Sequence, residues 1–260
     1  MRFLISILIA LFINLPLKEI KKNNEIPNKL VLQIQDRLVN NKDPKFNGTD
    51  NFYSDWIITK SANFIFHFPP KSLVTDRKQF AENHEQAFAK LNSFFNSNVP
   101  NKINYFVWNY SQDAERFGIG ELSFALPEFC IAHVHAKQSI GHEITHIITH
   151  YLPGSMGIRT KFINEGIATY FDLNNRAVYG GPGFKKPNEK ISLKEAWLND
   201  NKYSDYVYYF LGAEVLKLLN QNFGKTKLLR LIENQSYENA EKIYGRELDI
   251  ILNEIEKKIN

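Results

Sequence analysis

The sequence has a single cysteine, Cys130, in 260 residues. One cysteine cannot form an internal disulfide, and there is no second cysteine with which to build a zinc knuckle. We expect Cys130 to be a small buried apolar residue. The sequence also lacks a dense basic stripe interleaved with aromatic residues, although its formal net charge is +4. We therefore expect no nucleic-acid surface.

Long apolar runs are also scarce, and the one that stands out lies at the start. Met1-Arg2 is followed by mostly apolar residues from Phe3 to Leu17, which is typical of a secretory signal segment and short for a bilayer span. Residues 14–17 lack a small-x-small cleavage pattern, so an uncleaved membrane anchor is the alternative. We expect the protein to be exported, either secreted, periplasmic or on the outer face of a membrane.

Apolar residues make up 43% of the chain and charged residues 23%, as in an ordinary globular protein with a packed core. No internal repeat is visible. We expect a signal peptide or N-terminal anchor at 1–20, a lead-in segment at 21–50 with one helix at 28–40, and a single large domain at 51–260.

The order of the predicted elements indicates the fold class. We expect strands or hairpins first, at 56–68, 103–108 and 129–135, with one amphipathic helix at 76–96 among them. Helices are then expected at 139–151, 159–173, 192–199, 204–222, 226–233 and 237–258, the last with a break near Gly245. This order predicts an α+β domain in which a small mixed sheet is followed by a helical half.

The pentapeptide His142-Glu143-Ile144-Thr145-His146 reads H-E-x-x-H. In a helix, positions i and i+4 lie on one face, so both imidazoles can reach one metal ion, with the glutamate beside them. Ser139 is the expected N-cap of this helix, and Pro153-Gly154 supplies a stop. The alternative is a surface helix with two solvated histidines.

A second helix carries the segment from Asn164 to Tyr170, NEGIATY, and eighteen residues separate His146 from Glu165. Two histidines and one glutamate leave the fourth tetrahedral position open for water, which is the arrangement of catalytic zinc. Pro153, Gly154 and Gly157 allow the chain to turn back antiparallel. The sequence thus predicts one Zn²⁺ held by His142, His146 and Glu165.

H-E-x-x-H followed by N-E-G-x-A-x-Y at this spacing resembles the gluzincin metallopeptidases, which include thermolysin and the zinc aminopeptidases. The segment from Tyr209 to Ala213, YFLGA, is similar to a Y-x-x-G-A step of the aminopeptidase branch, whose tyrosine stabilises the tetrahedral intermediate. The resemblance implies that Tyr209 assists catalysis, with Tyr206 and Tyr208 as alternatives. The G-x-M-E-N sequence of that branch has no counterpart before His142, so aminopeptidase specificity is not implied.

Three other histidines and a second zinc-peptidase pattern offer alternatives. Metzincins continue as H-E-x-x-H-x-x-G-x-x-H, but Thr149 and Leu152 stand at those two positions. His150 lies one further turn along the helix, so we do not expect it to be a ligand. His133 and His135 share one face of a strand. We expect them to be partly exposed residues of an edge strand; a cleft role is the alternative, since gluzincins lay substrate along the strand before the zinc helix.

The resemblance implies hydrolysis of peptide bonds by a zinc-activated water, with Glu143 as the general base. The expected partner is a peptide or protein substrate, and a membrane only through an uncleaved N-terminal segment. The alternative is an exported zinc-binding module, or a hydrolase of another amide or an ester. Because the chain keeps Glu143 and all three ligands, we favour the enzyme.

Overall fold

The computed structural model describes residues 43–120, 123–154, 157–173 and 189–260. The expected signal segment and the expected helix at 28–40 lie outside these residues. Residues from Pro44 to Asn260 group into one unit by their contacts. Among the described helices, none combines the length and the apolar character needed to cross a bilayer.

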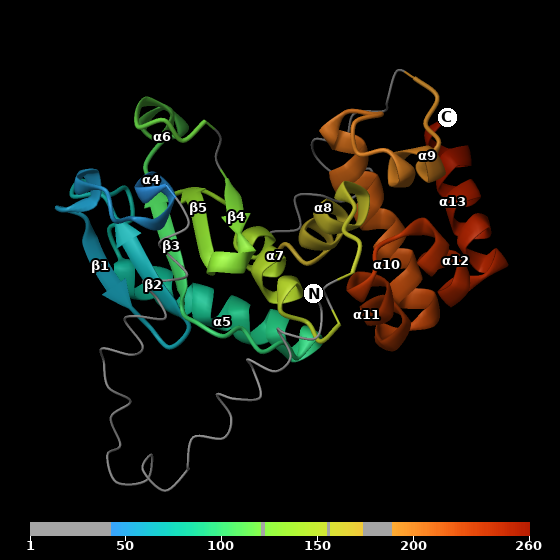
Figure 1. Ribbon diagram of the computed structural model, residues 1–260, viewed down its shortest axis with the longest axis horizontal. Helices are drawn as coiled ribbons and strands as arrows, with labels where there is room; N and C mark the ends of the chain where they lie inside the picture. The colour runs from blue at the N-terminus through green and yellow to red at the C-terminus, as the bar shows by residue number, and fades with distance from the viewer. Residues whose placement is uncertain (1–42, 121–122, 155–156, 174–188) are drawn as a thin grey trace, which may run out of the picture. The chain divides into compact units, whose positions relative to one another are not determined.

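Five strands form one mixed sheet in the order β1-β2-β3-β5-β4 (Figure 1). The strands are β1 Ile57–Lys60, β2 Phe64–Phe68, β3 Ile103–Trp108, β4 Phe124–Leu126 and β5 Ile131–His135. β1 and β2 form an antiparallel hairpin, one of the two alternatives predicted for 56–68. β2, β3 and β5 run parallel, and β4 is antiparallel to β5. β5 begins two residues later than predicted, because Pro127–Phe129 forms a 3₁₀ turn and Cys130 takes a left-handed φ of 51°.

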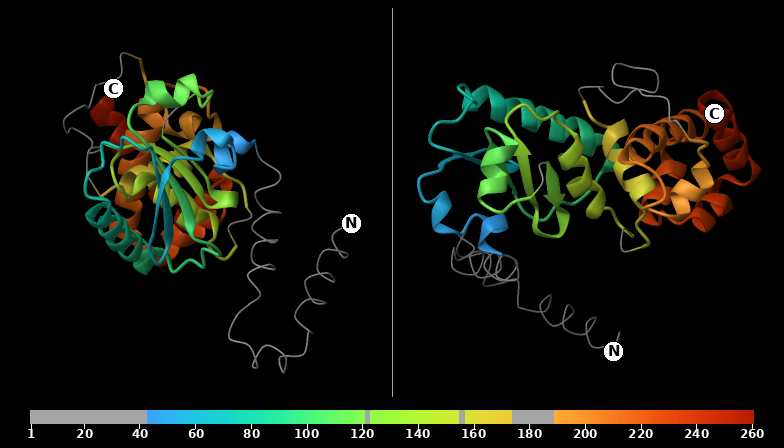
Figure 2. Two further views of the ribbon diagram at one scale, coloured as in Figure 1. Left: turned by 90° about the vertical axis from the view of Figure 1, so that its left-hand side faces the viewer. Right: turned by 90° about the horizontal axis from the view of Figure 1, so that it is seen from above.

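Each face of the sheet is covered. Phe64, Phe66 and Phe68 alternate onto the face that packs against α5, Arg77–Phe95. The short helix α4 (Pro44–Asn47) and the turn η1 (Asn51–Tyr53) cover the opposite face (Figure 2). Buried aromatic side chains, among them Tyr53, Trp56 and Trp108, form a second cluster there. Cys130 is buried in the core, as expected.

The helical half follows the sheet, so the predicted α+β class is confirmed. Its helices are α7 His142–His150, α8 Lys161–Tyr170, α9 Leu193–Leu198, η3 Val207–Leu211, α10 Gly212–Phe223, α11 Lys225–Glu233, α12 Tyr237–Tyr244 and α13 Arg246–Ile259. Each matches a predicted helix, and the last predicted helix breaks at Gly245, which has a φ of 59°. The structure adds α6, Ser111–Arg116, in a segment where no helix or strand was predicted.

The prediction for His133 was wrong. β5 lies between β3 and β4 and is not an edge strand, and His133 is fully buried. The indole N–H of Trp108 donates to its Nδ1 (3.1 Å), while its Nε2–H donates to the carbonyl oxygen of Phe46 (2.8 Å). Its ring stacks between Phe106 and Phe124 on the neighbouring strands. With both nitrogens satisfied inside the sheet, His133 supports the fold and does not line a cleft.

His84 is a second buried histidine, and it should make stability depend on pH. Its Nδ1–H donates to the Phe80 carbonyl (2.8 Å), and its ring lies against Phe66, Phe80 and Tyr105. Burial lowers its pKa from 6.5 to about 4, against the opposing effect of the Phe80 hydrogen bond. Between pH 6.5 and pH 4 the imidazole of His84 is therefore protonated in the unfolded chain but neutral in the folded protein. The free energy of unfolding then falls by about 3 kcal/mol as the pH is lowered to 4.

We expect His84→Leu to flatten that dependence by up to one proton, or about 1.4 kcal/mol per pH unit near pH 5. Urea unfolding of wild type and variant between pH 7 and 4 measures the two slopes. Their difference removes the contribution of other titrating groups, including His133, whose pKa burial also lowers to about 4. Equal pH dependences of the unfolding free energy in wild type and His84→Leu would show that His84 is not the cause.

A glycine pair allows α8 and α10 to cross closely. A Cβ added at Gly212 would meet the carbonyl oxygen of Phe162 at 2.5 Å, and one added at Gly166 would meet the backbone carbon of Gly212 at 2.7 Å. Backbone atoms in packed helices cannot move aside cheaply. Gly166 adjoins Glu165 in sequence, so this crossing also positions the second helix of the predicted metal site.

We expect Gly212→Ala to lower the free energy of unfolding by about 1–3 kcal/mol, because overpacking outweighs the better helix propensity of alanine. Chemical denaturation followed by circular dichroism measures the change. Gly120→Ala is the matched control, since its Cβ would meet nothing within 4 Å. Equal losses in the two variants would show that the glycine crossing is not the cause.

Candidate metal centre

Helix α7 carries the pentapeptide and is almost wholly buried. All of its residues except His150 are buried, and it contacts α5, α8, β4 and β5. The expected N-cap was wrong: Gly141 caps the helix at a φ of 130°, with no side-chain cap. Ser139 lies too early for that role, and its hydroxyl donates to Asp172 Oδ2 instead (2.5 Å).

The two helices that bear the predicted ligands are tied at both ends. Before α7, the Ile140 carbonyl accepts from the N–H of Leu173, just after α8, beside the Ser139–Asp172 hydrogen bond. At the other end, Arg159 Nη2 donates to the carbonyl oxygen of Thr149 (3.0 Å). The start of α7 is thus joined to the end of α8, and the end of α7 is joined to the segment just before α8. This arrangement confirms the predicted antiparallel return.

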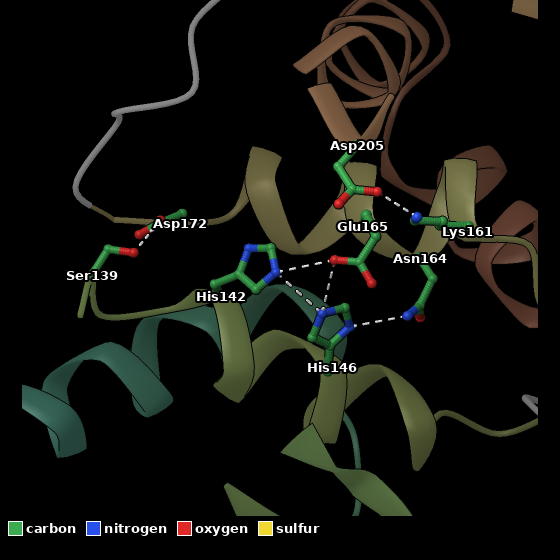
Figure 3. Close-up of polar contacts among 8 residues, drawn as sticks. All are labelled: Ser139, His142, His146, Lys161, Asn164, Glu165, Asp172 and Asp205. Atoms are coloured by element: carbon green, nitrogen blue, oxygen red, sulfur yellow. Dashed lines mark hydrogen bonds and ion pairs between the residues drawn. The ribbon is translucent and has the colours of Figure 1, made fainter. Parts of the chain in front are cut away.

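The side chains of His142, His146 and Glu165 converge between these helices (Figure 3). His142 Nε2 lies 3.2 Å from His146 Nε2 and 3.3 Å from Glu165 Oε2, and the remaining separation, His146 Nε2 to Glu165 Oε2, is 3.5 Å. Neighbouring donor atoms of a tetrahedral zinc site are about 3.3–3.4 Å apart when the ligand bonds are about 2.0–2.1 Å. The three residues form a group that can hold a metal ion.

Electrostatics at the triad also suit a cation. Burial acts to raise the pKa of Glu165, but its contacts with both histidines outweigh that effect and hold the pKa well below the ordinary value. Glu165 therefore stays a carboxylate. The closely spaced nitrogens of two buried histidines and this anionic oxygen are the ligand types that Zn²⁺ prefers.

Asn164 contacts one of the predicted ligands, a role that was not predicted from the sequence. Its Nδ2 lies 3.2 Å from Nδ1 of His146. A histidine that binds metal through Nε2 carries its proton on Nδ1 and needs an acceptor there. Turning the amide over leaves its shape unchanged and presents Oδ1 as that acceptor. The signal was present in the sequence, where Asn164 directly precedes Glu165.

Glu143 is buried beside the triad, 4% exposed, and lines the same cavity as all three ligands. Burial raises the pKa of its carboxyl group to about 7; His142 opposes this effect, and Glu165 and Asp172 add to it. A carboxyl group with a pKa near neutrality can both accept and return a proton. The structure thus places this glutamate beside the three predicted ligands.

Among the candidate tyrosines, Tyr209 is the one that reaches the triad. Its ring is parallel to that of His142, with centroids 5.5 Å apart, and its hydroxyl pKa is raised by burial and by a hydrogen bond to Glu165. Tyr208 is fully buried and donates to the Asn199 carbonyl (2.8 Å), while Tyr206 stacks on Phe210. Tyr209 lies in η3, which is a π-helical turn. Turns of this kind are often found at functional sites.

The cavity over the triad has a volume of about 260 Å³, and Phe124 and Ala125 of β4 form part of its wall. β4 is last in the strand order and pairs only with β5, so in the described part of the chain its outer edge has no partner strand. The strand in the wall of this cavity is therefore β4, not β5, which directly precedes α7. His150 does not belong to the metal-binding group.

The chain matches no protein-family model, and a search among curated proteins finds no match.

Proposed function

We propose that the protein is a zinc-dependent peptidase of the gluzincin type, and that it is exported. The single observation that carries the proposal is a buried glutamate, Glu143, in one cavity with a triad of His142, His146 and Glu165. A structural zinc site would need four protein ligands and no neighbouring base. Three ligands with an adjacent carboxyl group of raised pKa suit hydrolysis.

The residues divide the chemistry among them. When bound, the ion would supply a Lewis acid that lowers the pKa of water and polarises a carbonyl group. Glu143 accepts a proton from the attacking water and returns it to the leaving amine. Tyr209, whose raised pKa keeps its hydroxyl protonated, turns that hydroxyl from Glu165 to the developing oxyanion and donates a hydrogen bond to it.

The outer edge of β4, which has no partner strand among the described residues, supports a peptide as the substrate. An extended peptide can add to an exposed strand edge through main-chain hydrogen bonds. Phe124 and Ala125 lie both on this strand and in the wall of the cavity, so a peptide added to β4 would bring one of its bonds to Glu143. Esters and small amides have no extended main chain that could pair with β4.

Incubation of the purified protein with a peptide library, with and without a chelator, tests the proposal. We expect internal cleavage that the chelator abolishes and that Zn²⁺ restores. Zinc-loaded protein that binds peptides and leaves all of them intact would favour a binding module. Cleavage of esters or small amides alone would favour the other hydrolase.

Tyr209→Phe should lower kcat on the order of 10²-fold with little change in KM, since it removes one donor to the transition state. Steady-state kinetics on a cleaved peptide measures both constants. Tyr206→Phe removes a neighbouring phenol that stacks on Phe210 and serves as the control. An unchanged rate in Tyr209→Phe would contradict the assigned role.

A further inference from the structure

A second pocket adjoins the metal centre. Its volume is about 430 Å³, and it shares Pro127, His146, Asn164 and Glu165 with the cavity described above. A ligand that reaches the triad can therefore extend into it. Arg159, Lys161 and Asp200 form part of its remaining wall, so charge should decide what the pocket accepts.

The charges around Lys161 largely balance one another. Its ammonium group lies 2.5 Å from Asp205 Oδ1 (Figure 3) and 4.8 Å from the centre of the Tyr208 ring. Its backbone N–H, at the start of α8, donates to Asp200 Oδ1 (2.8 Å). The two aspartates are thus held by one lysine and one helix end.

Arg159 is another cationic residue in the wall of this pocket. Its guanidinium is half-buried and is held against the end of α7 by the hydrogen bond to the Thr149 carbonyl. Burial lowers the pKa of Arg159, yet a guanidinium remains protonated in a protein. A poorly hydrated cation in a pocket wall gains from an incoming anion, and the planar fork of arginine matches a carboxylate with two hydrogen bonds.

The position of Glu143 sets the direction of the substrate. Glu143 lines the cavity but not this pocket. In the proposed hydrolysis it returns a proton to the leaving amine, so the amine half of the substrate lies on the Glu143 side. The acyl half then extends towards Arg159.

Building on the proposed peptidase function, we propose that Arg159 binds the carboxylate of an acidic side chain on the N-terminal side of the scissile bond. Arg159 is then a specificity residue, and the substrates are peptides with Asp or Glu before the cleaved bond. A charge-assisted pair of this kind corresponds to a preference of about 10- to 100-fold over the neutral amide.

Peptides capped at both ends, with Asp or Glu replaced by Asn or Gln one position at a time, test this proposal. The readouts are kcat/KM for the wild type and, on a zinc-loaded Glu143→Gln background, affinity by fluorescence anisotropy. We expect the acidic preference at one position before the bond. Arg159→Gln should bring the ratio of acidic to neutral peptide near one, and Arg159→Glu should reverse it in favour of Lys or Arg. Arg116→Gln changes an exposed arginine on α6 and should retain the preference for acidic peptides.

Equal handling of acidic and neutral peptides, or a preference that survives Arg159→Gln, would overturn the proposal. A preference carried by a free C-terminal carboxylate would overturn it as well. Failure of the peptidase function gives a different result, in which acidic peptides bind in an Arg159-dependent manner but are never cleaved. Cleavage without any acidic preference would retain the peptidase and remove the subsite.

Discussion

Glu143→Gln should reduce peptide hydrolysis by about 10²- to 10⁴-fold while the protein still binds one equivalent of zinc. Glutamine has nearly the shape of glutamate and still accepts a hydrogen bond, but it cannot take a proton from water. Glu143 is buried, its pKa is raised to about 7, and it lines the cavity together with all three predicted ligands, which makes it the proposed proton acceptor. Its loss should appear in kcat, because the ligands and the β4 edge remain in place.

Zinc content and hydrolysis are measured on the same preparation, by metal analysis and by a peptide assay. Glu115→Gln, at an exposed site on α6, makes the same chemical change away from the cavity and should retain full activity. Full activity in Glu143→Gln with zinc bound would remove the proposed mechanism. A variant without zinc would instead indicate that Glu143 contributes to the metal site.

His146→Ala should weaken zinc binding by more than the 10- to 100-fold typical of losing a residue that only supports a ligand. His146 Nε2 lies within 3.5 Å of both other donor atoms, so its removal leaves two ligands. Competition with a chromophoric chelator measures the affinity. The matched control is His150→Ala, one turn further along α7 and outside the metal-binding group. Equal zinc affinity in the two variants would refute the ligand assignment.

The metal site could be predicted from the sequence because its geometry is local. Two histidines four residues apart lie on one face of any helix, so the pentapeptide needed only a helix to become a pair of ligands. Glu165 needed one further condition, a second helix that returns antiparallel. Pro153, Gly154 and Gly157 indicated that return, and the hydrogen bonds at both helix ends show it.

Features that depend on strand order or on helix contacts could not be predicted. The alternation of residues in β5 showed which of them share a face. It did not show that β4 would pair with β5 as the edge strand, so that His133 is buried. Three residues, Phe124–Leu126, are too few for a periodic signal. The π-helical turn that carries Tyr209 was missed for a similar reason: its apolar spacing suits an ordinary helix, and the crossing at Gly166 and Gly212 arises only in the packed structure.

The cross-ties between α7 and α8 bear on how the protein gains and loses its metal. Ser139–Asp172, Ile140–Leu173 and Arg159–Thr149 hold the ligand helices without help from an ion. In zinc fingers the metal supplies much of the folding free energy, and chelation unfolds them. We therefore expect metal exchange in this protein to be largely uncoupled from folding. On the proposed function, protein stripped of its metal should stay folded and regain activity when it is reloaded with zinc.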